Sequence, residues 1–502
     1  MKIHKLTLKN YRCFDEFEIL FPDSYTDESK ERKDLNLHVL LAPNMAGKSA
    51  ILKAIRIGIA TILQKVKVNV AGQYSLNISS REHRVIGNNP FSDIAREVEI
   101  ILLATFENLS HGAMEDKTYE WKRYKEDYSG RNTKTSHIQN DIAKDVNSTF
   151  NKVSELKIGV IPLFMFIGTE YIHQQKPVTD TLTQDGSIKQ GYWYCLDDKS
   201  MESYVFDWFQ KLYVTTVEQQ RSELANAFYD TFAADTIHTF KKAVQIILPD
   251  IINVDWIRNI FVKSDKYMLA FQIASEGIRT YDMLSDGYRY LVLLIGELVT
   301  RATLLNKHLG RDVLSEITGI VLIDEFGIHL HPNLQSDTLT RLSKLFPKVQ
   351  FIVTTHSPLL INGLRKEQLH IISENEDGHR TAQHPDEDAI GLGAEGILRE
   401  MFGLDSTFDE KSVQLNEEYK VLLKKKNAYE ISDEDLQRFE DLSKILAPVR
   451  LDPTLTITED DPVIEIVKDR LKEETEKFEK SVVNTQDLHS RVNSIMDDLL
   501  KG

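Results

Sequence analysis

Only two cysteines, Cys13 and Cys195, occur in the 502 residues, and they are far apart with no metal-type spacing. So few cysteines exclude the disulfide framework of a small secreted domain and suit a reducing compartment. No apolar run approaches the ~20 residues that a membrane-spanning helix needs, and the first residues lack the apolar core of a secretory signal. We therefore expect a cytoplasmic protein without a membrane partner.

An excess of positive charge is also missing, because 61 Lys and Arg stand against 77 Asp and Glu, a net charge of −16. This balance disfavours a general nucleic-acid coat protein, although it leaves room for a local basic groove. Residues 401–502 hold 15 basic and 24 acidic side chains, which is −9 of the total. Internal repeats and sustained heptads are absent as well, which excludes a long coiled-coil arm.

What is present is an ordinary globular composition, 41% hydrophobic, in a chain long enough for roughly two to four domains. Strands and helices alternate, which predicts an α/β fold with a mostly parallel sheet, helices on both faces and an antiparallel sheet beside it. We expect strands within 2–21, 35–41, 98–108, 119–127, 158–168, 254–274, 319–326 and 351–356, and helices at about 47–63, within 126–152, within 198–235 and from Tyr288.

This pattern divides the chain into a head, residues 1–400, and a helical region, residues 401–502. Within the head we expect lobes at about 1–200 and 255–400 with a helical insertion at about 200–255. Two apolar stripes at helical spacing mark the C-terminal region. Helices packed on the main body, or a surface for a partner or for oligomerisation, both explain the stripes, which are Leu436, Phe439, Leu442 and Leu446, then Ile464, Val467, Leu471, Phe478 and Val482.

The stretch APNMAGKS, residues 42–49, lies between a predicted apolar strand and a predicted helix. It fits the phosphate-binding pattern G-x-x-x-x-G-K-[ST], except that Ala42 replaces the first glycine. Gly47 lets the backbone approach a phosphate, Lys48 can reach the β- and γ-phosphates, and Ser49 can hold Mg²⁺. Ala42 costs backbone freedom but removes no ligand. The sequence therefore predicts a nucleotide loop with contacts from Asn44, Ala46, Gly47, Lys48, Ser49 and Ala50.

In the stretch GIVLIDEFGIHLHP, Asp324 and Glu325 follow an apolar strand. Open α/β sheets bind ligands at the carboxyl ends of their strands. We expect Asp324 to orient Mg²⁺ through water and Glu325 to activate the attacking water. Two solvated acids at a plain strand end are the alternative. His329 and His331 are spaced as i and i+2, but a third ligand at suitable spacing is missing nearby, so we expect no metal there.

Two further segments can serve the same site. In FIVTTHSP, His356 follows a strand and can hydrogen-bond the γ-phosphate or the attacking water, although a lone histidine there is more often structural. In LSDGYRYLVLLIGEL, Ser285 is a natural helix N-cap and Gly287 permits close approach. The start of this helix is a second place suited to an anion.

In this order the four segments resemble the ATP-binding-cassette (ABC) class of P-loop ATPases, in its SMC/RecF-like soluble branch, over residues 1–400. The resemblance implies ATP and Mg²⁺ as cofactors, and a head with a mixed sheet and an antiparallel β lobe. It implies that Ser285 and Gly287 act on nucleotide held by another subunit, in a head-to-tail dimer or a higher homo-oligomer. It also implies that Arg12 lies near the nucleotide and that Gln174, or Gln175, couples the metal to the second lobe.

Two looser stretches, YWYCLDDKSMESYVFDWFQ and EGILREMFGLDSTFDE, resemble the ATPase-subunit family of the Septu anti-phage defence system and related retron ATPases. That resemblance implies an ATPase that regulates a separate HNH nuclease acting on DNA, with the C-terminal helices as the docking part. The chain itself shows no HNH constellation. A stand-alone DNA-repair ATPase and a nucleotide sensor with little hydrolysis remain as alternatives.

Overall fold

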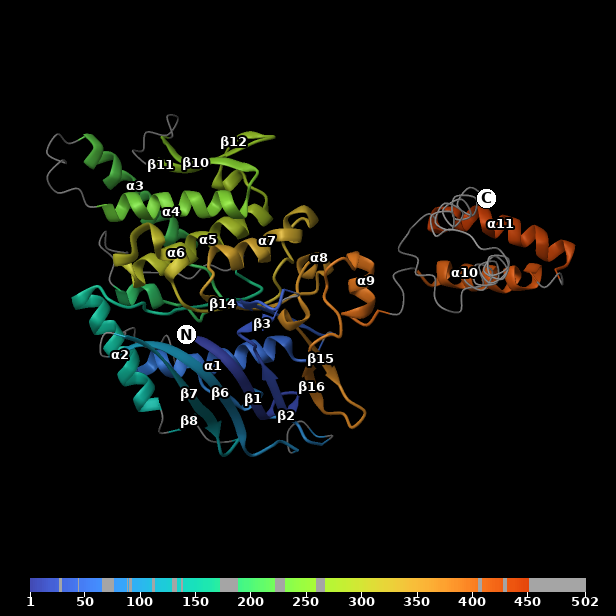
Figure 1. The fold of residues 1–502 in the computed structure, drawn as a ribbon, viewed down its shortest axis with the longest axis horizontal. Coiled ribbons are helices and arrows are strands. Elements are labelled where there is room, and N and C mark those ends of the chain that lie inside the picture. Colours follow the sequence, from blue (N-terminus) through green and yellow to red (C-terminus); the bar gives the residue numbers. More distant parts are fainter. Residues whose placement is uncertain are drawn as a thin grey trace, which may run out of the picture. The chain divides into compact units, whose positions relative to one another are not determined.

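The computed structural model describes residues 1–26, 29–43, 45–65, 76–87, 89, 93–110, 113–128, 133–136, 139–171, 188–221, 231–258, 267–404, 409–427 and 431–450. The chain forms two compact units, Met1–Gly403 and Leu404–Gly502. Figure 1 shows the elements of each unit. Among the helices of the described ranges, none is long and apolar enough to cross a membrane.

A six-stranded sheet lies at the centre of the first unit, with the order β16–β15–β5–β14–β13–β9 among the described strands. All neighbouring pairs are parallel except β15 and β16. Every residue of β5, β9, β13 and β14 is buried, as parallel strands covered on both faces require. The bounds are β5 (Leu37–Leu41), β9 (Leu163–Ile167), β13 (Gly319–Ile323), β14 (Val349–Thr354), β15 (Leu369–Glu374) and β16 (Arg380–Gln383).

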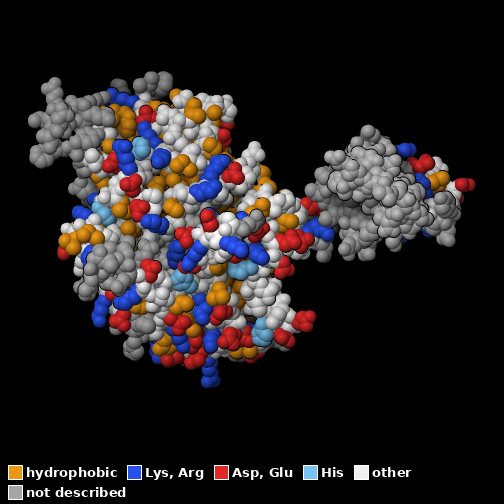
Figure 2. Space-filling model, viewed as in Figure 1, with side chains coloured by type: hydrophobic (Ala, Val, Ile, Leu, Met, Phe, Trp, Pro, Cys, Tyr) orange, Lys and Arg blue, Asp and Glu red, His pale blue; other side chains and the backbone are white. Residues whose placement is uncertain are grey.

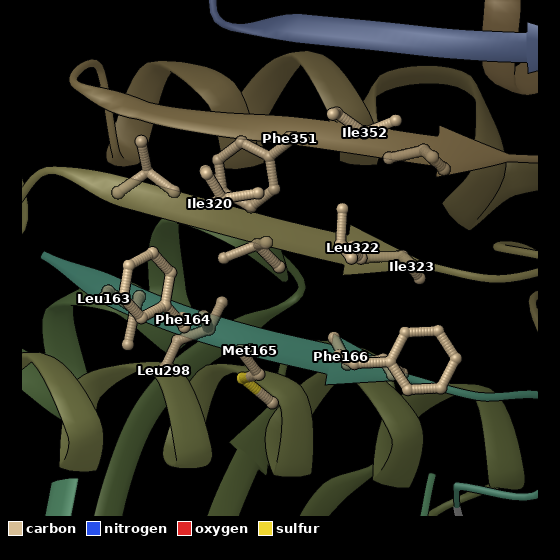
Figure 3. Packing of buried hydrophobic residues seen from close by; sticks show 14 of the residues in the cluster. Leu163, Phe164, Met165, Phe166, Leu298, Ile320, Leu322, Ile323, Phe351 and Ile352 are labelled. Atoms are coloured by element: carbon tan, nitrogen blue, oxygen red, sulfur yellow. The ribbon is translucent and has the colours of Figure 1, made fainter. Parts of the chain in front are cut away.

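Helices cover both faces of this sheet, which confirms the predicted α/β class. In Figure 1, α1 lies on the side of the antiparallel lobe, whereas α4 (Thr231–Ile247), α5 and α7 lie on the other side. Figure 3 shows Leu298 of α5 beneath the apolar side chains of β9. The bounds are α1 (Lys48–Lys65), α5 (Asp286–Leu305), α6 (Val313–Glu316), α7 (Pro332–Leu345), α8 (Pro358–Ile361) and α9 (Gly393–Glu400).

The antiparallel lobe is a five-stranded sheet with the order β2–β1–β6–β7–β8. It packs against α1, where Trp121 of β7 donates its indole N–H to the carbonyl of Gly58 at 3.2 Å. The predicted antiparallel sheet beside the core is therefore confirmed. The strands are β1 (Lys2–Tyr11), β2 (Phe14–Leu20), β6 (Val98–Ser110), β7 (Ala113–Lys125) and β8 (Lys134–Thr135), with α2 (Gln139–Leu156) following and the small ribbon β3 (Ser24–Thr26) and β4 (Arg32–Asp34) nearby in sequence.

Between the two sets of central strands the chain forms α3 (Glu202–Arg221) and α4 (Thr231–Ile247), then the sheet β10 (Ile251–Arg258), β11 (Tyr267–Ile273) and β12 (Gly277–Thr280). Aromatic side chains hold this part together, for example Phe209 against Phe240 with ring centroids 4.4 Å apart. The prediction placed the start of α5 at Tyr288. The helix begins at Asp286, two residues earlier, and Ser285 takes the N-cap position, as the sequence predicted.

In the second unit, α10 (Glu410–Asn427) and α11 (Asp433–Arg450) pack on each other. Phe439, Leu442 and Leu446 of the first predicted stripe are buried against Tyr419 and Leu422 of α10. This stripe is therefore covered within the second unit. The second predicted stripe, Ile464 to Val482, lies outside the described residues.

Candidate nucleotide site

Three neighbouring parallel strands, β5, β14 and β13, end at one edge of the central sheet. The loop 42–47 follows β5, Asp324 and Glu325 follow β13, and His356 follows β14. Since parallel strands bring their carboxyl ends together, segments about 280 residues apart in sequence share one edge.

Lys48 is the first residue of α1, and its side chain is buried inside the loop. Its ammonium donates to the carbonyl of Ala42 at 2.7 Å and to that of Pro43 at 3.4 Å. Burial lowers the pKa of Lys48, while Glu325 and Asp324 act to raise it. The two carboxylates are therefore close enough to act on this ammonium.

The strain in the loop lies at Met45, not at Ala42. Met45 has φ +67°, a left-handed conformation that costs a residue with a Cβ about 1 kcal/mol or more. Ala42 is buried with an ordinary negative φ, and its carbonyl accepts from Lys48. Alanine therefore fits at position 42 without left-handed strain. Gly47 has φ +103°, and a Cβ there would lie 2.6 Å from Phe14 and 2.7 Å from Cys13, so glycine is required.

Asp324 lies opposite the start of α1. Its Oδ1 accepts from Ser49 Oγ at 3.1 Å and from Thr354 Oγ1 at 2.6 Å. The Thr354 hydroxyl also accepts the backbone N–H of Glu325 at 2.7 Å, so one buried hydroxyl holds both acidic residues. Sequence reasoning missed Thr354, although the motif FIVTTH contains it.

Glu325 has φ +50°, a left-handed conformation that is rare for a non-glycine residue and often marks functional sites. Its amide bond to Thr354 helps to hold this turn. His356 is exposed near the same edge. Burial and then Lys48 lower the pKa of His356, against opposing effects of Glu325 and Asp324. The predicted roles of Glu325 and His356 stay predictions, but both side chains are within electrostatic range of Lys48.

The Ser49 hydroxyl and the Asp324 carboxylate bring oxygen atoms together at the start of α1. A hydroxyl and a carboxylate are ligands that suit Mg²⁺, and the start of α1 presents free N–H groups to an anion. The residues present therefore fit a nucleotide with Mg²⁺. Asn44 and Gln174, with its alternative Gln175, lie outside the described residues, so their predicted contacts stay untested.

Arg12 lies in the turn between β1 and β2, whose next residues contact Gly47. Its guanidinium donates to Glu82 at 3.1 Å, and Lys53 of α1 pairs with the same carboxylate at 2.7 Å. Burial acts to raise the pKa of Glu82, but Lys53, Ser79 and Arg12 together lower it to about 2. The ion pairs tie the turn to α1. Contact of Arg12 with a nucleotide stays a prediction.

The start of α5 lies beside the loop that follows Glu325. Ser285 is exposed and makes no side-chain capping bond. Gly287 is buried, and a Cβ on it would lie 2.8 Å from the carbonyl of His329. Within this chain, the close approach of Gly287 is therefore to backbone. His331 is the N-cap of α7 and accepts from the amide of Asn333 at 3.3 Å.

A phosphate-binding loop, an acidic strand end and a histidine strand end lie on adjacent parallel strands, with a second helix start beside them. This arrangement is the one that a P-loop nucleotide-binding fold requires. Comparison with known families agrees on the ATPase class. A model described as "AAA domain" matches residues 5–231, and one described as "AAA domain, putative AbiEii toxin, Type IV TA system" matches residues 196–362.

Among curated proteins, the chain is similar to Septu protein PtuA of Bacillus mycoides (strain KBAB4), with 30% identity over 212 residues, 42% of this chain and 28% of that protein. It is similar to Retron Ec83 probable ATPase of Escherichia coli, with 32% identity over 155 residues, 31% of this chain and 27% of that protein. Septu protein PtuA of Bacillus thuringiensis is 28% identical over 173 residues, 34% of this chain and 43% of that protein. The match thus spans less than half of each relative.

Among solved structures, the SmcHead bound to the C-winged helix domain of ScpA aligns with a TM-score of 0.44 and 14% identity, over 76% of this chain and 98% of that one. The SMC head domain from Thermotoga maritima aligns with a TM-score of 0.36 and 14% identity, over 76% of this chain and 99% of that one.

Proposed function

We propose that this protein binds and hydrolyses ATP with Mg²⁺, as the ATPase subunit of an anti-phage defence complex that regulates a separate HNH nuclease acting on DNA. The observation that carries the ATPase part is the convergence of Lys48, Ser49, Asp324 and Glu325 at one sheet edge, with Thr354 holding the last two.

Each side chain has a distinct task in this proposal. Lys48 would leave the carbonyls of the loop and donate to the β- and γ-phosphates. Ser49 and Asp324 would hold Mg²⁺, which supplies charge neutralisation on the phosphates when bound. Glu325 would accept a proton from the attacking water, and His356 would hydrogen-bond the γ-phosphate or that water.

We further propose that the working unit is a head-to-tail dimer or higher homo-oligomer in which Ser285 and Gly287 complete the site of another subunit. The Ser285 hydroxyl makes no capping bond within its own helix. Three apolar side chains are exposed on the segments of the site: Met45 in the loop after β5, Met283 just before α5 and Ile328 in the loop after Glu325. Contact with a second head would cover them, and burying apolar surface favours association.

The ATPase proposal is tested with two variants and three measurements. Lys48→Ala should abolish ATP binding in titration calorimetry, because it removes the cation that reaches the phosphates. Glu325→Gln should keep ATP affinity but stop phosphate release, and should accumulate an ATP-dependent dimer in size-exclusion chromatography. Unchanged affinity in the first variant would reject the site, and wild-type turnover in the second would move the base to another group, with His356 next.

The defence part of the proposal rests on similarity to proteins named Septu PtuA and retron ATPase. On the face in Figure 2, Lys and Arg side chains are interspersed with Asp and Glu. We therefore propose that DNA contact comes through the complex. A stand-alone DNA-repair ATPase and a sensor with little hydrolysis remain the alternatives. A neighbouring reading frame with an HNH pattern would favour defence over repair, and measurable turnover would reject the sensor.

We propose the second unit, from Leu404 onward, as the partner-binding or oligomerisation region. Val421 and Ile445 expose apolar side chains on α10 and α11. Val421→Asp with Ile445→Asp should abolish capture of a co-expressed HNH partner while ATP binding persists. Leu442→Asp is the matched control for loss of the helix pair, because Leu442 is buried there. Capture that survives all three changes would place docking elsewhere.

A further inference from the structure

The turn between β1 and β2, residues 10–13, has an unfavourable backbone conformation. Asn10 has φ +50° and Arg12 has φ +52°, both in the left-handed region that residues with a Cβ disfavour. Neither residue is a glycine, so the sequence does not relieve this strain. Two such residues in one short turn persist only where the surrounding structure holds them.

A short segment, residues 82–84, pairs with this turn along the backbone. The amide of Arg12 donates to the carbonyl of Glu82 at 2.8 Å, and the amide of Arg84 donates to the carbonyl of Asn10 at 3.0 Å. An antiparallel bridge joins the residues between these two pairs. These backbone bonds hold the turn from the side of residues 82–84.

The Glu82 carboxylate adds a second attachment, made by a side chain. It is 1% exposed, accepts from Arg12 at 3.1 Å and pairs with Lys53 of α1 at 2.7 Å. It also accepts the amide of Ser79 at 2.8 Å. A buried carboxylate is costly unless it is paired and hydrogen-bonded, and here its partners come from three segments. One carboxylate therefore joins the turn, its own segment and α1.

The residues that follow Arg12 pack against the phosphate-binding loop. A Cβ on Gly47 would lie 2.6 Å from the ring of Phe14 and 2.7 Å from Cys13 Sγ. Cys13 Sγ also lies 3.9 Å from the carbonyl oxygen of Ala46. The turn therefore limits how far the loop backbone at residues 46–47 can move toward it.

The loop is held from its other end as well. It continues into α1, whose first residue is Lys48, and Lys53 lies about one and a half turns further along that helix. Glu82 thus acts on residues 46–47 through the turn and on α1 through Lys53. In a phosphate-binding loop, backbone N–H groups cradle the α- and β-phosphates. The shape of this segment therefore matters equally for nucleoside diphosphates and triphosphates.

We propose that Glu82 is a positioning residue for the phosphate-binding loop, and that its charge supports the affinity for ATP and ADP. The inference rests on the proposed ATP binding at this loop. Glu82→Gln keeps the size of the side chain but removes the charge that attracts Arg12 and Lys53. The affinities for ATP and ADP should then fall by the same factor, about tenfold or more. The Mg²⁺ requirement should not change, because the oxygens of Ser49 and Asp324 are untouched.

The first test is titration calorimetry of the full chain with ATP and with ADP. Asp388→Asn is the matched control, since Asp388 accepts from Arg365 at 3.1 Å and from the amide of Lys366 at 2.8 Å, just before β15 begins. Because β15 is parallel to β5, that contact lies at the sheet edge opposite the phosphate-binding loop. The control should leave both affinities unchanged.

Lys53→Met is a second variant, at a partly exposed position, that removes one partner of Glu82. It should weaken ATP and ADP binding by a smaller common factor. Combined with Glu82→Gln it should add little, because both changes act on the same ion pair. Should Glu82→Gln fail to fold, Lys53→Met carries the same comparisons.

The second test needs no nucleotide. Cys13 is partly exposed and Cys195 is buried, and the chain has no other cysteine, so N-ethylmaleimide reports on the turn. Alkylation of Cys13 should be faster in Glu82→Gln and in Lys53→Met than in the wild-type chain. The two variants change the local charge in opposite directions, so a faster rate in both reports movement of the turn and not a change in thiol pKa. Asp388→Asn should react at the wild-type rate.

Unchanged affinity for both nucleotides in Glu82→Gln would overturn the proposal. Weaker binding of ATP with ADP unaffected would overturn it too, and so would weaker binding without faster alkylation of Cys13 in either variant. If the wild-type chain bound neither nucleotide, the proposed function would be rejected instead, and the alkylation rates alone would decide whether Glu82 holds the loop.

Discussion

Thr354→Val removes the hydroxyl that bonds the acidic residues after β13, Asp324 and Glu325, to the neighbouring strand β14. The side chain is fully buried, so valine keeps its shape and removes only the hydroxyl. Two bonds are lost together: the donation to Asp324 Oδ1 at 2.6 Å and the acceptance from the amide of Glu325 at 2.7 Å.

The size of the effect follows from these two bonds. A hydrogen bond to a charged carboxylate contributes about 1.5–3 kcal/mol, and an amide left without a partner costs about 1–3 kcal/mol when buried. Glu325 is only half-buried, so water can satisfy part of the second loss. We expect a fall of about 2–4 kcal/mol in the free energy of unfolding. Because Asp324 also loses the group that orients it, Mg²⁺ affinity should fall about 10- to 100-fold.

The assay is the Mg²⁺ concentration that gives half-maximal ATP binding, followed with a fluorescent ATP analogue. Thr355→Val is a matched control at the next position. Thr355 is equally buried, donates to the carbonyl of Phe326 at 2.8 Å and accepts from the amide of Ser357 at 3.1 Å. It should destabilise the protein without changing the Mg²⁺ requirement, and Thr354→Ser should restore it. Equal Mg²⁺ requirements for both valine variants would refute the reasoning.

Three further outcomes can be measured by thermal unfolding. Met45→Gly should raise the midpoint by relieving the left-handed strain of a side chain that is 92% exposed, whereas Met45→Ala should not. Burial lowers the pKa of His38 to about 3 and also lowers the pKa of His370, so below pH 6.5 these two histidines bind protons in the unfolded chain but not in the folded one. Their contribution to stability should therefore be complete above pH 6.5 and fall as the pH drops toward 3, and a flat profile below pH 6.5 would contradict this. Tyr171→Phe removes a buried 2.5 Å hydrogen bond to Glu297 and should cost about 1–3 kcal/mol; no change would show that the bond contributes nothing.

The fold class was predictable because short stretches of the sequence show the apolar pattern of each strand or helix and the order in which they follow one another. The apolar runs of β5, β9, β13 and β14 are short, continuous and bounded, as buried parallel strands require. The later elements α7, β15 and β16 were missed. β16 is only partly buried and pairs antiparallel at the sheet edge, so its four residues carry no strong apolar pattern.

The site was predictable as far as sheet topology alone assembles it. Once β5, β14 and β13 are parallel neighbours, Lys48 and Asp324 must share an edge, whatever the intervening residues do. The roles that depend on tertiary contact were not accessible in this way. The approach of Gly287 to an anion stays a prediction; what the sequence did not indicate is that its missing Cβ also makes room for the carbonyl of His329, 42 residues later in sequence.

That packing has a consequence for the site. Because a Cβ at Gly287 would lie 2.8 Å from the carbonyl of His329, the start of α5 packs directly against the loop between Glu325 and His331. The same loop begins with the strained turn at Glu325, whose amide is held by Thr354. A ligand or second subunit that contacts Ser285 would therefore lie beside the same loop whose first residue, Glu325, is the proposed base. The sequence motifs locate the start of α5 and Glu325 separately. Only the folded structure shows that the loop between Glu325 and His331 lies against both.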